Sequence, residues 1–179
     1  MSEDTYPAGG TLNWLRAGVL GANDGIVSVA AVAIGVAGAT TAVHPILIAG
    51  LAALIGGAFS MALGEYVSVS SQRDSQRAAR GGGHASEDVS PWHAAFASAL
   101  AFLVGGVLPL TAIILLPEPL KAAGTALVVL IALAGAGVIS AKLGRAKVLR
   151  GTLRVTIGGL LALAATFLLG MILGTTGVV

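Results

Sequence analysis

The stretch ILIAGLAALIGGAFSMALG, residues 46–64, contains neither a charged residue nor a proline. Its length is close to the roughly 20 residues that an α-helix needs to cross the hydrocarbon core of a membrane. Other stretches of similar length and composition lie on both sides of it. We therefore predict five membrane-spanning helices, at about residues 14–39, 45–69, 93–116, 120–141 and 153–173.

The composition of the whole chain supports a membrane protein. Of the 179 residues, 56% are hydrophobic and 10% are charged, and the mean hydropathy is +0.93. A soluble domain is about 25% charged. The 26 glycines allow helices to approach closely in lipid, and the absence of cysteine excludes disulfides and thiolate metal sites. The expected fold is an all-α, five-helix transmembrane bundle forming a single domain over residues 1–179.

Lysine and arginine predict the orientation of the bundle, because they are enriched in cytoplasmic loops. Nine of the ten basic residues fall on one side of a five-span protein, and only Lys121 falls on the other. This places the N-terminus in the cytoplasm, the C-terminus outside, and cytoplasmic loops at about 70–92 and 142–152. Topology explains these basic residues, so we expect no nucleic-acid partner.

Two carboxylates lie inside predicted spans, Asp24 in the first and Glu65 in the second. A charged side chain near the middle of a bilayer is unfavourable by about 2.5 kcal/mol or more, so such residues normally face a cavity or a partner. The two helices are antiparallel, and counting residues from their cytoplasmic ends places Asp24 and Met61 at similar depth. The carboxylates are therefore the first candidates for a functional site.

Residues around Glu65 extend the candidate site along one helix face. Met61 lies one turn from Glu65, Gly57 continues the same face, and Ser68 lies one turn nearer the cytoplasm. Carboxylates bind divalent cations and exchange protons, and a thioether favours transition metals over Mg²⁺ or Ca²⁺. Because we expect no basic residue in these spans to neutralise Asp24 and Glu65, a cation or a proton must do so.

Each of these residues has a second interpretation. Asp24 is also a candidate N-cap of a helix that begins at Gly25. Glu65 is a candidate interfacial residue whose side chain reaches water. Met61 taken alone is more often a packing residue than a ligand. The sequence leaves these alternatives open.

The motifs that contain these residues resemble the vacuolar iron transporter family. The first is GANDGIVS, residues 21–28, and the second is GAFSMALGEYVS, residues 57–68, followed by SSQRD at 70–74. Both motifs are long and stand in the family's order. The predicted five spans with a cytoplasmic N-terminus also match, so the resemblance covers nearly the whole chain.

The resemblance implies a function and an assembly. Family members export Fe²⁺, often also Mn²⁺, from the cytosol in exchange for protons, and need no other cofactor. They form homodimers with the translocation path at or near the dimer interface. By motif match, Asp24 and Met61 would line that path, with Glu65 beside them. The expected partners are thus divalent metal ions, protons, membrane lipid and a second copy of the chain.

One departure from the family concerns the connection at 71–91. Typical members carry a glutamate-rich cytoplasmic domain there, whereas in this chain Glu87 is the only glutamate of the connection, with Asp88 beside it. It resembles the shorter nodulin-like and prokaryotic members, which suggests a prokaryotic plasma membrane, or the vacuolar membrane if the source is eukaryotic. The alternative function is a non-transporting membrane scaffold with structural carboxylates. Without a nucleophile–base pair or a histidine cluster, we do not expect an enzyme.

Overall fold

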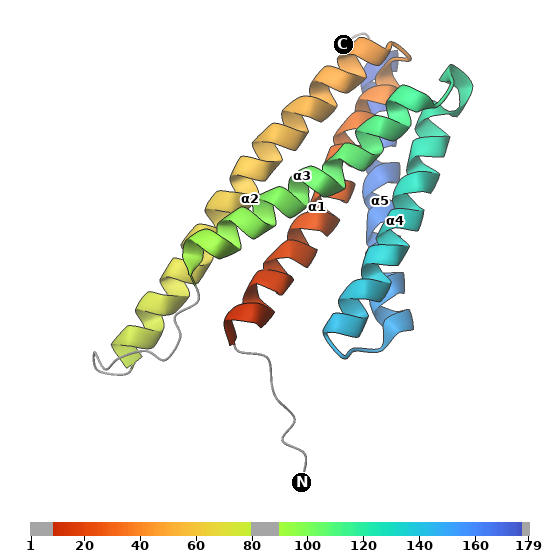
Figure 1. Ribbon diagram of the computed structural model, residues 1–179. Helices are drawn as coiled ribbons and strands as arrows, with labels where there is room; N and C mark the ends of the chain where they lie inside the picture. Colours follow the sequence, from red (N-terminus) through yellow and green to blue (C-terminus); the bar gives the residue numbers. More distant parts are fainter. Residues whose placement is uncertain (1–8, 80–89, 177–179) are drawn as a thin grey trace.

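The computed structural model describes residues 9–79 and 90–176, and these form a bundle of five long helices (Figure 1). The helices are α1 (Gly9–Ala39), α2 (Val43–Ala79), α3 (Pro91–Leu115), α4 (Lys121–Leu143) and α5 (Val148–Thr175), with the short 3₁₀ turn η1 (Glu118–Leu120) before α4. All five are long and apolar enough to cross a membrane, and the described residues include no strand. The prediction of an all-α, five-helix, multi-pass membrane protein is confirmed.

Helix α1 lies at the centre of the described bundle. It contacts α2, α3, α4 and α5, whereas α2 contacts only α1 and α3. Figure 1 shows α3 crossing α1, with α2 on one side and α4 and α5 on the other. The helix that carries Asp24 is therefore held from several directions, and α2 forms an outer wall.

Glycines allow α1 and α3 to approach at backbone distance. A Cβ atom placed on Gly21 would meet the backbone of Ser98, and one placed on Gly25 would meet the backbone of Phe102. Gly105 of α3 lies equally close to the carbonyl of Ala22. Small residues serve this purpose in membrane bundles because lipid offers no hydrophobic drive for helix association. Gly21 and Gly25 thus make a contact within the chain.

Helix α2 extends beyond the end of its apolar stretch. The sequence predicts a span ending near 69 and a loop from about 70, but the helix continues to Ala79. The segment after Val69 is polar yet contains no glycine or proline, and its alanines, arginines and glutamines favour helix. The end of an apolar segment therefore predicts where a helix leaves the lipid, but it does not predict where the helix itself ends. Glu87 and Asp88 lie outside the described residues.

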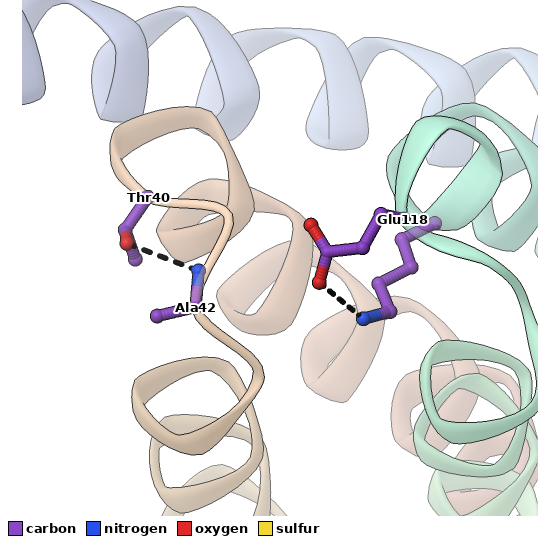
Figure 2. A network of polar contacts seen from close by, with 4 residues as sticks. Thr40, Ala42 and Glu118 are labelled. Atoms are coloured by element: carbon purple, nitrogen blue, oxygen red, sulfur yellow. Dashed lines mark hydrogen bonds and ion pairs between the residues drawn. The ribbon is translucent and has the colours of Figure 1, made fainter.

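The two short turns at one end of the bundle are fixed by polar contacts (Figure 2). Between α1 and α2, the backbone N–H of Ala42 donates to the Thr40 hydroxyl at 3.2 Å. Before α4, the Lys121 ammonium and the Glu118 carboxylate lie 2.9 Å apart. The other basic residues of the described chain belong to the opposite end of the bundle, either on its helix ends or in the α4–α5 turn.

Candidate functional site

Asp24 lies well inside α1, which runs without interruption from Gly9 to Ala39. The interpretation of Asp24 as an N-cap is therefore wrong, because no helix begins there. Its side chain is partly buried and accepts a hydrogen bond of 2.5 Å from the hydroxyl of Ser28, one turn further along the helix. This bond leaves the second carboxylate oxygen of Asp24 for another ligand, since an ionised carboxylate has about four acceptor positions.

Glu65 is buried in the wall formed by α2. Only 6% of its side chain is exposed, although it lies on the helix that is outermost on this side of the bundle. The interpretation of Glu65 as an interfacial residue reaching for water is therefore wrong. A buried carboxylate is strongly unfavourable unless a charge or hydrogen-bond donors compensate it, so its surroundings matter.

The predicted site residues all line one open cavity of about 530 Å³ between α1 and α2. Asp24 lines it from α1, and Met61 and Glu65 line it from α2. The two path-lining candidates, Gly57 and Ser68, belong to the same cavity. The structure thus brings together every residue that the sequence singled out. Whether they bind metal is a separate question.

Arg16 contributes a positive charge that the sequence analysis did not place in this site. Its guanidinium lies 3.7 Å from the carboxylate of Glu65, and its own side chain is 57% exposed. The expectation that no basic residue of these spans would neutralise the carboxylates is wrong for Glu65. The reason is geometric: Arg16 lies near the start of α1, where the antiparallel α2 carries Glu65 past it.

The side chain of Met61 lies between the cavity and the apolar core of the bundle. It lines the cavity, and it also packs against an apolar cluster that includes Leu54 and Phe102. Phe102 projects from α3 to the cavity floor, and its ring occupies the place where a Cβ on Gly57 would lie. Packing holds the thioether in position while one side of it faces the cavity. The packing interpretation of Met61 is therefore supported, and its role as a metal ligand stays a prediction.

The sequence analysis missed several residues of the cavity. Their signal was the spacing from Asp24: Arg16 lies two turns before it and Ser28 one turn after it, so the three share a face of α1. Ser60 lies on the corresponding face of α2. Phe102 carries no such signal, because only the crossing of α3 over α1 brings it to the site.

The ligands of the cavity do not form a closed metal cage. Within the described residues, no group of three or more histidines, aspartates and glutamates is arranged to hold a metal ion. The cavity instead offers two carboxylates from different helices, a thioether and serine hydroxyls. Such an open and sparse set suits a cation that binds briefly and leaves.

Comparison with known proteins agrees with the motifs. A model of the VIT family matches residues 15–81 and 79–171. Vacuolar iron transporter homolog 5 of Oryza sativa subsp. japonica is 44% identical in an alignment of 173 positions, which covers 93% of this chain and 83% of that protein. Vacuolar iron transporter homolog 4 of Arabidopsis thaliana is 41% identical in an alignment of 181 positions, which covers 98% of this chain and 91% of that protein.

The family match reaches all five membrane-spanning helices, and the two relatives match over 83% and 91% of their own lengths. The resemblance recognised in the two motifs is confirmed: this chain belongs to the VIT family.

Proposed function

We propose that this protein exports a divalent transition-metal cation, Fe²⁺ and also Mn²⁺, from the cytosol in exchange for protons. The observation that carries the proposal is the α1–α2 cavity, where Asp24, Met61 and Glu65 meet. The printed names of the relatives, vacuolar iron transporter homologs, support a metal cargo. The membrane is the vacuolar one if the source is eukaryotic and the plasma membrane if it is prokaryotic.

The cation enters a cavity that already holds one positive charge. The Arg16 guanidinium lies next to Glu65, so an arriving metal ion competes with it for the carboxylate. Asp24 and Met61 lie further than Glu65 from the end of the bundle that carries the basic residues. They act as the next ligands, Asp24 with a hard carboxylate oxygen and Met61 with a soft thioether sulfur. Metal binding requires deprotonated carboxylates, so protonation on the acidic side releases the metal and couples the two fluxes.

The ligand set is completed by a second copy of the chain. One copy supplies few ligands, and its cavity is open beside an exposed face of α2. Gly56, Ser60 and Gly64 recur every fourth residue on that face, and no atom lies within 4 Å of a Cβ placed on either glycine. A small-residue stripe of this kind lets two helices approach closely in lipid. A two-fold axis beside α2 would bring two cavities together.

The structure removes the main argument for the alternative function, a non-transporting membrane scaffold. It depended on carboxylates without a positive partner in the chain, which would have required another subunit. Arg16 supplies such a partner for Glu65. Transport is therefore the function that the cavity supports best.

The direct test is metal flux in proteoliposomes that contain the purified protein and carry a pH gradient. We expect uptake of Fe²⁺ and Mn²⁺ by the wild type, with a counterflow of protons. Asp24→Asn should reduce the flux about tenfold or more, since losing an interaction of ~1.4 kcal/mol weakens binding tenfold. Glu118→Gln is the matched control, because it removes a carboxylate at the exposed turn before α4. Full flux in Asp24→Asn, or none in the wild type, would contradict the proposal.

A further inference from the structure

A second and smaller cavity lies between the polar end of α2 and the start of α3. Its volume is about 180 Å³, space for roughly six water molecules. From α2 it is lined by Tyr66, Ser70, Arg73, Asp74 and Arg77. None of these residues belongs to the α1–α2 cavity, so the second cavity is a separate site.

The α2 wall of this cavity presents donors that suit a phosphate group. Ser70, Arg73 and Arg77 recur at three- and four-residue intervals, which places them on one face of the helix. A guanidinium matches two phosphate oxygens with parallel N–H groups. Both arginines also have partners within the protein, and five N–H donors on each allow a bound anion to share them.

The α3 wall adds the positive end of a helix. Pro91 is the first helical residue, and the side chain of Ser90 makes no capping hydrogen bond. The backbone N–H of Ala94 donates to the carbonyl of Ser90 at 3.2 Å in the first turn of α3. The helix dipole at this end of α3 favours negative charge nearby. The dipole of α3 adds to the attraction that Arg73 and Arg77 exert on an anion.

The position of the cavity identifies the source of the phosphate. Tyr66 and Trp92 line it with their rings 4.7 Å apart, and paired aromatic residues of this kind mark the boundary between lipid and water. Because Arg73 and Arg77 follow the apolar part of α2, we expect them to lie near the depth of lipid headgroups. Basic pockets between transmembrane helices at this depth bind anionic headgroups.

We propose that this cavity binds the phosphate of an anionic phospholipid headgroup. Two guanidiniums and the carboxylate of Asp74 are among the side chains that line it. A phosphodiester, the form found in a membrane phospholipid such as phosphatidylglycerol, presents the pair of oxygens that a guanidinium matches. The proposal concerns a lipid site outside the transport cavity and stands independently of the proposed metal transport.

The test uses Trp92 as a reporter, because it lines the cavity and is one of only two tryptophans in the chain. Trp14→Phe leaves Trp92 as the single emitter. The full-length protein is reconstituted into phosphatidylcholine bilayers that contain brominated phosphatidylglycerol, and separately into bilayers with brominated phosphatidylcholine. Quenching of Trp92 then gives the relative affinity of the two lipids. We expect phosphatidylglycerol to be favoured about fivefold.

Variants separate the site from general surface charge. Arg73→Gln combined with Arg77→Gln should abolish the preference, whereas Arg150→Gln combined with Arg154→Gln removes the same charge from α5 and should preserve it. Equal quenching by both lipids in the Trp14→Phe reporter protein overturns the proposal, whatever the arginine variants show. An equal loss in the α5 control also overturns it. Relief of the phosphatidylglycerol quenching by millimolar inorganic phosphate would support the proposal, because the two phosphates would then compete for the same guanidiniums.

Discussion

At the scale of single residues, we expect Met61 to influence which metal the cavity prefers. Its thioether is the only soft ligand among the residues that line the cavity. Met61→Leu keeps nearly the same volume against Phe102 and removes the sulfur. We expect the ratio of Fe²⁺ to Mn²⁺ flux to fall about fivefold, equivalent to about 1 kcal/mol, because Mn²⁺ depends more on oxygen ligands. Competition between the two metals in proteoliposomes measures this ratio.

Met171→Leu provides the control for that experiment. Met171 lies near the end of α5, is 44% exposed, and does not line the cavity. The same chemical change there should leave the flux ratio as in the wild type. An unchanged ratio in Met61→Leu would mean that Met61 acts in packing alone.

Arg16 is expected to hold the metal-free cavity together at the expense of metal affinity. In Arg16→Gln, the buried Glu65 loses its counter-charge, so the metal-free protein should unfold at a lower temperature. The same variant should bind metal more tightly, with KM lower by about 3–10-fold, because no guanidinium competes for the carboxylate. Thermal unfolding with and without Mn²⁺, together with flux kinetics, separates the two effects.

Lys121→Gln is the matched control for Arg16→Gln. It breaks the Glu118–Lys121 pair at the opposite end of the bundle, where Glu118 is 59% exposed. Neither the unfolding temperature nor KM should change much, because the charge left behind is that of the exposed Glu118, which water can solvate. An Arg16→Gln variant that loses stability but keeps the wild-type KM would limit Arg16 to a structural role.

At the scale of helices, the α1–α3 contact should tolerate no added side-chain atom. Gly25→Ala places a Cβ against the backbone carbonyl of Phe102, so the two helices must separate. We expect a loss of about 1–3 kcal/mol in stability, as for overpacked cores. Gly18→Ala, on the same helix, has open space around its Cβ and should not destabilise the protein. Thermal unfolding in detergent compares the two variants, and equal midpoints would argue against close contact in the membrane.

The helices themselves could be predicted from the sequence because lipid imposes a minimum apolar length. That rule finds the spans and fails at the helix ends, since a polar segment such as 70–79 can continue a helix through water. The motif residues Asp24, Met61 and Glu65 could be predicted as neighbours from helix spacing and antiparallel depth. Arg16 and Phe102 could not be assigned to the site in this way, because their positions depend on how neighbouring helices cross.

At the scale of the whole molecule, the small-residue face of α2 should contact its own counterpart in a second copy. The chain contains no cysteine, so one introduced cysteine reports a single position. Gly64→Cys should form a disulfide-linked dimer under mild oxidation in membranes, since this requires Cα atoms within about 7 Å. Leu161→Cys, exposed on α5, is the control and should stay monomeric on a denaturing gel. Equal cross-linking at both positions would indicate random collision.

The glycine contacts between α1 and α3 also restrict the motions available to a transport cycle. Two helices in backbone contact at Gly21, Gly25 and Gly105 cannot slide or rotate past one another without a collision. Helices α1 and α3 must therefore move as one rigid unit that carries Asp24. Helix α2 meets this unit mainly through side chains such as Leu54 and Met61, which can change rotamer. We therefore expect the cavity to open and close by a displacement of α2, whose helix continues beyond its apolar part to Ala79.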